Sequence, residues 1–161
     1  MGIGSFLPSI HKSDGWQGQY VRIIRWYIKF ERTNPGNFES PVVDEEHDIL
    51  YACFQNIFIL KDWLHHSGNI STQVLNKFIN ENLELQLCRD IANGTKHFNL
   101  SNASVDNDFT IIREYQHFHM VSNTPPYKVI ILASGHKFDL KELAFKCINL
   151  WEQFIRHHGM I

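Results

Sequence analysis

Apolar side chains recur every three or four residues over most of the chain, which is the period of an amphipathic helix. This pattern predicts helices over residues 17–33, 41–66, 72–80, 83–98 and 140–158. The residues at the predicted ends agree with it. Pro41 suits a first helical turn, Gly68 a helix end, Ser71 or Thr72 the cap of the third helix, and Asp139 the cap of the last.

The pattern changes in the last third of the chain. Residues 99–108 are polar and predict a loop, whereas residues 109–121 and 127–134 are rich in β-branched and aromatic side chains. The two runs, joined by "SNTPP", predict a hairpin of two antiparallel strands. We therefore expect a mainly α domain over residues 1–161, a bundle of four to five helices with a β-hairpin inserted before the last helix. Residues 1–16 are expected to form an irregular arm.

The predicted helix over residues 41–66 carries two apolar stripes rather than one. The inner stripe consists of Leu50, Cys53, Ile57, Leu60 and Leu64. The second consists of Tyr51, Phe54 and Phe58. So wide an apolar surface predicts either a central helix or one that also meets a partner chain.

Composition predicts an ordinary globular domain. Of the 161 residues, 43% are hydrophobic and 20% charged, and the net charge of −2 gives no basic field for long duplex nucleic acid. The three cysteines lie in apolar segments, which favours free thiols in a reducing compartment. We see no signal-peptide pattern and no apolar run long enough for a membrane span, and we therefore expect a cytoplasmic protein with no membrane partner.

The segment Arg89–His97, "RDIANGTKH", carries the strongest chemical signal. Residues four apart lie only about 40° apart around a helix, so Arg89, Asn93 and His97 form one polar stripe, with Lys96 beside it. The roughly opposite side carries residues that suit a core: Leu87, Ile91, Gly94 and Phe98. The stripe combines a guanidinium, an amide, an imidazole and an ammonium, a set that suits binding a phosphate and moving a proton near pH 7.

Two roles are open for this stripe. In metal-free RNA cleavage, His97 would be the general base or acid, Arg89 would grip the phosphate and Asn93 would orient either of them. Lys96 and Asp90 would then contribute to substrate binding. In the alternative, the stripe is a structural polar network that fixes helix packing. Arg89 would then be held by Asp62 or Glu84, and Asp90 would pair with a neighbouring helix.

The motif and the predicted bundle resemble the HEPN superfamily. Many HEPN proteins are metal-independent ribonucleases or their inactive relatives, in toxin–antitoxin, phage-defence and RNA-processing systems, with an active site formed at a dimer interface. The resemblance implies that Arg89 contacts phosphate, Asp90 is its polar neighbour and His97 is the catalytic histidine. The HEPN motif places fewer residues between its Arg and His than the seven found here. The stretch "CRDIANGTKHFNL", with "LKDWL" and "INLWEQFI", also looks like uncharacterised bacterial proteins of similar size.

Three further groups of residues give weaker signals. Asp44 and His47 have the spacing of a bundle metal ligand pair, but one pair is too few, and a solvated acidic helix start over residues 44–48 explains them better. His117 and His119 are two residues apart, so they lie on the same face of the predicted strand, and we expect this face to be solvated rather than to bind a metal. A basic row could take an RNA backbone, or simply face water: Arg22, Arg25, Lys29 and Arg32.

These patterns together predict an RNA-directed HEPN-like protein, either a metal-independent endoribonuclease or an inactive binder of RNA or nucleotide. We expect no cofactor and no metal, and a homodimer, with an antitoxin or defence protein as a possible partner. The alternative is a non-catalytic protein–protein interaction module in which the stripe of Arg89, Asn93 and His97 is structural.

Overall fold

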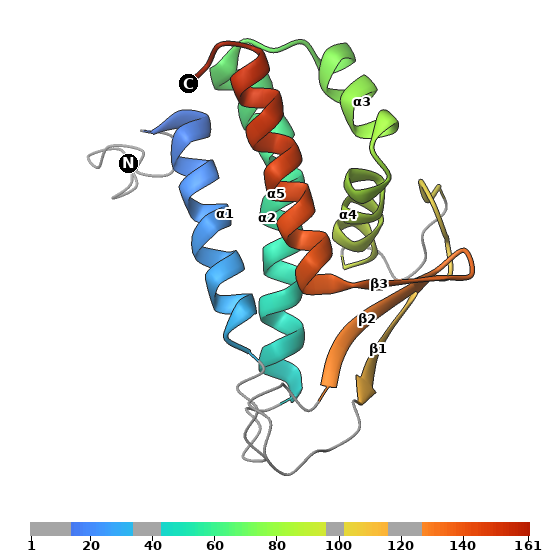
Figure 1. Ribbon diagram of the computed structural model, residues 1–161. Coiled ribbons are helices and arrows are strands. Elements are labelled where there is room, and N and C mark those ends of the chain that lie inside the picture. Colours follow the sequence, from blue (N-terminus) through green and yellow to red (C-terminus); the bar gives the residue numbers. More distant parts are fainter. Residues whose placement is uncertain (1–13, 34–42, 96–101, 116–126) are drawn as a thin grey trace, which may run out of the picture.

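The computed structural model describes residues 14–33, 43–95, 102–115 and 127–161. Its elements, in chain order, are α1 (Gly15–Glu31), α2 (Val43–Gly68), α3 (Thr72–Glu81), α4 (Leu83–Gly94), β1 (Thr110–Tyr115), β2 (Tyr127–Ala133), β3 (His136–Asp139) and α5 (Leu140–His157). The predicted helical bundle with a small antiparallel sheet before its last helix is thus confirmed (Figure 1). Among the described helices, none is long and apolar enough to cross a membrane.

Helix α2 forms the centre of the bundle, because it contacts α1, α3, α4 and α5. Its inner stripe is buried as predicted. Phe54 and Phe58 of the second stripe are also buried, and the Phe54 ring packs edge-on against Phe30 with ring centroids 6.4 Å apart. The wide apolar surface of α2 is therefore explained by its central place in the bundle, without contact to a partner chain.

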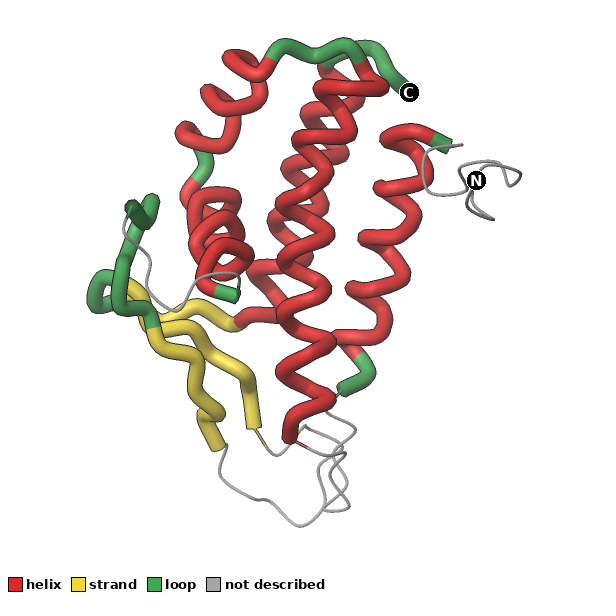
Figure 2. Tube along the Cα trace, turned by 180° about the vertical axis from the view of Figure 1, so that it is seen from behind, coloured by secondary structure: helices red, strands yellow, loops and turns green. Residues whose placement is uncertain are grey.

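The sheet lies beside the start of α5, where β2 and β3 contact that helix (Figure 2). Strand β2 is its middle strand and pairs with both neighbours in antiparallel register. Alternate β2 side chains, Tyr127, Val129 and Ile131, are buried against the core, and Ile130 on the opposite face is buried as well.

The prediction of two strands was incomplete, because β3 forms a third. Strands β2 and β3 are joined by Ser134 and Gly135, whose φ angles of +48° and +78° suit a tight hairpin turn. Strand β3 has only four residues and leads directly into the cap of α5, so no polar segment marks its end. The Ser-Gly pair was the available signal.

The predicted caps Ser71 and Asp139 are confirmed, whereas Pro41 lies outside the described residues. The Ser71 hydroxyl accepts the N–H of Val74 at 3.3 Å, and the Asp139 carboxylate accepts the N–H of Lys141 at 2.9 Å. Helix α4 ends at Gly94 rather than continuing to residue 98, and residues 96–101 lie outside the described residues.

Candidate functional site

Helix α4 carries two residues of the predicted stripe, Arg89 and Asn93. Leu87 and Ile91 are buried, at 1% and 0% exposure, so the predicted core side is confirmed for these two residues. Arg89 and Asn93 are half-buried on the other side of the helix. Lys96, His97 and Phe98, which the sequence places after them, lie outside the described residues.

Asp90 is buried, at 2% exposure, and its carboxylate holds the loop that follows α4. Its Oδ1 accepts the backbone N–H of Ser104 at 2.6 Å, and its Oδ2 accepts those of Val105 at 2.7 Å and Asp106 at 3.4 Å. The sequence predicts that Asp90 contacts substrate or pairs with a neighbouring helix. The pairing with a helix is wrong, because the Asp90 carboxylate bonds to a loop. A buried carboxylate needs donors, and here backbone N–H groups of a loop supply them.

The same loop is fastened to the sheet by a second carboxylate. Asp106 Oδ2 accepts the N–H of Ser134 at 2.7 Å, and the Ser134 hydroxyl donates to the carbonyl of Val105 at 2.9 Å. Hydrogen bonds from the backbone N–H of Ser134 and then of Asp108 lower the pKa of Asp106, because they favour its charged form. The loop is therefore held by α4 on one side and by the β2–β3 turn on the other.

Arg89 is oriented by two neutral acceptors. Its Nε donates to the Ser104 hydroxyl at 2.6 Å, and its Nη2 donates to Oδ1 of Asn80 at 3.0 Å. It forms no ion pair with any carboxylate of the described chain, so neither of the predicted partners, Asp62 or Glu84, holds it. Among the described residues, no carboxylate thus neutralises the positive charge of Arg89.

Asn93 lies one turn further along the same edge of α4, and its side chain makes no hydrogen bond within the described part of the chain. The end of α4 is fixed beside it. Gln55 of α2 donates to the Thr95 hydroxyl, which itself donates to the carbonyl of Ala92 at 2.8 Å. The edge therefore carries an oriented guanidinium and an amide with no described hydrogen-bond partner, on a helix that is anchored at its end.

A buried polar cluster that the sequence analysis missed joins α2 to the sheet. Glu46 is 1% exposed, although we expected its acidic segment to face water. Its Oε2 accepts the Tyr127 hydroxyl at 2.5 Å, and its Oε1 lies 3.4 Å from Nη2 of Arg113. The Arg113 guanidinium also lies over the Tyr127 ring, 4.8 Å from the ring centre. The available signal was spacing, because Glu46 precedes Leu50 by one turn on the inner stripe.

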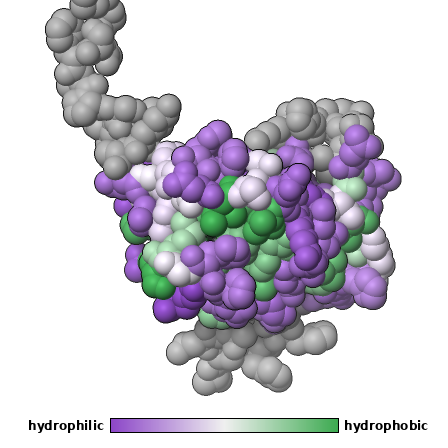
Figure 3. All heavy atoms as spheres, turned by 90° about the horizontal axis from the view of Figure 1, so that it is seen from above, coloured by the Kyte–Doolittle hydropathy of each residue, from purple (hydrophilic) through white to green (hydrophobic). Residues whose placement is uncertain are grey.

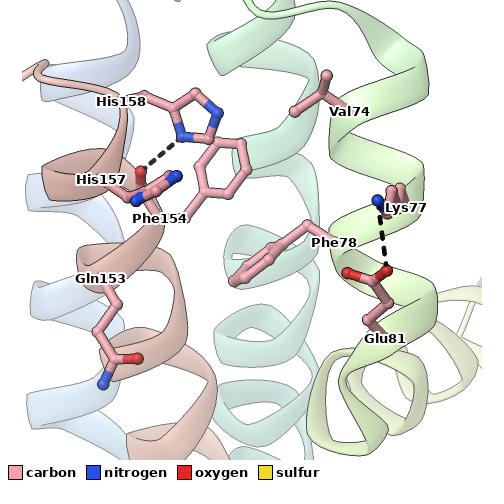
Figure 4. Close-up of a pocket in the computed structure, with 8 residues that line it drawn as sticks. All are labelled: Val74, Lys77, Phe78, Glu81, Gln153, Phe154, His157 and His158. Carbon is pink, nitrogen blue, oxygen red and sulfur yellow. Dashed lines mark hydrogen bonds and ion pairs between the residues drawn. The ribbon is translucent and has the colours of Figure 1, made fainter.

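A groove of about 590 Å³ runs between α3 and α5 (Figure 4). No Cα of α3 lies within 8 Å of a Cα of α5, and aromatic side chains bridge the gap, with the Phe78 and Phe154 ring centroids 4.7 Å apart. Lys77 and Glu81 pair at 3.8 Å on the α3 side. The remaining lining residues are Val74, Gln153, His157 and His158. The groove therefore combines an aromatic floor with polar sides.

Apolar surface continues over the end of the bundle where α3 begins and the chain ends. Figure 3 views this end and shows hydrophobic residues at its centre, framed by hydrophilic ones. Val74 and Ile161 are among the exposed large hydrophobic residues, at 41% and 64% exposure. Such a surface is more typical of a contact with another molecule than of isolated solvent exposure.

The other candidate groups contribute less. His117 and His119 lie outside the described residues, as does the side chain of Asp44. Within the described ranges, no group of three or more His, Cys, Asp or Glu side chains could hold a metal ion. In the basic row of α1, Arg22 hydrogen-bonds Gln19 at 2.8 Å, and Lys29 lies over the Trp26 ring at 4.5 Å.

Comparison of this chain with protein-family models, curated proteins and solved structures finds no significant match.

Proposed function

We propose that this chain is an RNA-directed, HEPN-like protein whose binding site is the polar edge of α4. The observation that carries the proposal is the state of Arg89. Its guanidinium is half-buried and oriented by Ser104 and Asn80, yet no described carboxylate neutralises it. An arginine held in direction by neutral groups is prepared for an anion, and phosphate matches the guanidinium fork.

The rest of the motif supplies the other parts of the proposed site. The Asn93 amide follows Arg89 by one helical turn, and Lys96 and His97 come next in the sequence. In this proposal Lys96 adds positive charge, and His97 is the group that would donate or accept a proton. Since seven residues separate Arg89 from His97, more than in the HEPN motif, we propose RNA or nucleotide binding with weak metal-independent cleavage or none.

Assembly and location belong to the same proposal. We propose a cytoplasmic homodimer that acts in a toxin–antitoxin or phage-defence setting. The second stripe of α2 no longer supports a dimer, because Phe54 and Phe58 are buried within one chain. Support now comes from large hydrophobic residues that stay exposed, among them Phe145 at 50% exposure on α5.

Fluorescence anisotropy with a labelled single-stranded RNA of mixed sequence tests the proposal. We expect the parent protein to bind, and Arg89→Ala to weaken binding about tenfold or more, since a charged hydrogen-bonding pair is lost. Arg156→Ala is the matched control, because Arg156 is exposed and already paired with Glu152 at 2.7 Å. Equal weakening by both substitutions would indicate general charge attraction, and absence of binding by the parent would refute the proposal.

The second candidate function is a non-catalytic protein–protein interaction module, and the groove between α3 and α5 favours it. An aromatic floor between two helices suits the apolar face of a partner helix, such as one from an antitoxin or defence protein. In this case the bonds of Arg89 and Asp90 serve only to hold the loop. Arg89→Ala would then lower the melting temperature while the parent protein bound no RNA.

A further inference from the structure

We propose that Ser104 is a positioning residue that sets the direction in which Arg89 presents its guanidinium to a phosphate. The inference rests on the function proposed above and deepens it. Ser104 has two bonds that connect the two charged residues of the motif. Its backbone N–H donates to Asp90 Oδ1 at 2.6 Å, and its hydroxyl oxygen accepts the Nε–H of Arg89, also at 2.6 Å.

The position of the Ser104 hydroxyl is fixed from both sides of its loop. The next residue, Val105, donates its N–H to Asp90 Oδ2 at 2.7 Å. Asp106 then reaches the backbone of Ser134 at 2.7 Å. Because α4 and the sheet both hold this backbone, the hydroxyl is an acceptor at a defined place rather than on a freely moving loop.

The two bonds to Arg89 leave a specific edge of its guanidinium available. Ser104 accepts from Nε and Asn80 accepts from Nη2, so both bonds engage the side of this planar group that carries Nε and Nη2. The donors that remain are those of Nη1 and one N–H of Nη2. A phosphate would therefore be bound end-on, by two parallel hydrogen bonds to Nη1 and Nη2.

The contact with Arg89 distinguishes Ser104 from residues that only hold the loop. Ser134 anchors the same loop through its side-chain hydroxyl, which donates to the Val105 carbonyl, and through its backbone N–H, which donates to Asp106. Neither group bonds to Arg89. Ser134→Ala therefore removes a loop contact of the same chemical kind and leaves the Arg89 contact intact. Ser104→Thr keeps a hydroxyl at the orienting position and serves as the conservative variant.

Binding of labelled single-stranded RNA, measured by anisotropy, is the first test. We expect Ser104→Ala to raise the Kd about tenfold, because Arg89 loses its direction although its charge remains. Ser104→Thr should stay within about twofold of the parent, and so should Ser134→Ala. Parent-like binding by Ser104→Ala, or an equal loss in Ser104→Ala and Ser134→Ala, would overturn the positioning role.

Exchange of the Arg89 Nε–H with water, followed by ¹⁵N NMR, gives a readout that needs no RNA. We expect a signal protected from exchange in the parent and in Ser134→Ala, and rapid exchange in Ser104→Ala. Unchanged exchange in Ser104→Ala would overturn the proposal. If the parent bound no RNA, the proposed function would fail together with the end-on ligand, and the exchange measurement would then decide separately whether Ser104 orients Arg89.

Discussion

Asp90 Oδ1 accepts the backbone N–H of Ser104 at 2.6 Å. The Ser104 hydroxyl in turn accepts the Nε–H of Arg89, the residue directly before Asp90 in α4. The two adjacent charged residues of the motif thus have opposite environments. Asp90 is buried and bonded to the loop, whereas Arg89 is half-buried and has no acidic partner in the part of the chain that the structure describes.

Replacing Asp90 by Asn should destabilise the protein. The side chain keeps one acceptor oxygen but loses its charge and brings an NH₂ group against backbone N–H donors, which should cost about 1–3 kcal/mol. Urea unfolding followed by circular dichroism measures this change. Asp62→Asn is the control, because Asp62 is exposed and makes only a long ion pair, 4.0 Å, with Lys61. Its effect should stay within about 0.5 kcal/mol, and equal effects of the two substitutions would contradict the role given to Asp90.

Replacing Glu46 by Ala should be more damaging. It leaves the Arg113 guanidinium without its acid and the Tyr127 hydroxyl without the carboxylate that accepts its hydrogen bond. Removing one partner of a buried ion pair costs about 3–5 kcal/mol. Glu142→Ala removes an exposed partner of Lys146 and should cost about 0.5 kcal/mol or less. A loss for Glu46→Ala as small as that control would show that the cluster does not join the sheet to α2.

The contact between Asp106 and Ser134 should persist in acid. Backbone N–H groups lower the Asp106 pKa below its ordinary value of 3.8, so the bond stabilises the fold above that pH and is lost as pH falls through the lowered pKa. The amide chemical shift of Ser134, followed by NMR titration, should therefore change with a midpoint below 3.8. A midpoint above this value would contradict the contact, and Asp106→Asn should abolish the titration.

The cysteines should be unreactive in the folded protein. Cys53, Cys88 and Cys147 are buried free thiols, and burial raises the pKa of Cys53 to about 12 and that of Cys88 well above its ordinary value. Since the thiolate is the reactive form, a thiol reagent such as DTNB at about pH 8 should modify them only after denaturation. Rapid modification of the native protein would show that the core opens readily.

The spacing of apolar residues predicted the helices, because each helix buries one face and that face must be apolar. The inner stripe of α2, the core side of α4 and the caps Ser71 and Asp139 could all be read from residue spacing. Strand β3 could not be separated from the start of α5, because a two-residue turn and a direct cap leave no polar segment between them.

The candidate site was harder to predict, because its partners come from distant segments. The helical spacing placed Arg89 and Asn93 together, but it could not show that Ser104, 15 residues further on, returns to accept Arg89. Nor could it show that Glu46 meets Tyr127 across 81 positions of the chain. The charge of Glu46 and its place at a helix start predict exposure to water, whereas its position one turn before Leu50 on the apolar stripe predicts burial. The structure follows the second signal.

The salt dependence of RNA affinity tests the central claim most directly, because each phosphate contact contributes to the slope of log Kd against log salt. For single-stranded RNA, we expect Arg89→Ala to reduce the magnitude of that slope by about 0.7 relative to the parent. The paired control Arg156→Ala should leave the slope unchanged. A parent and an Arg89→Ala variant with the same slope would contradict a phosphate contact at Arg89.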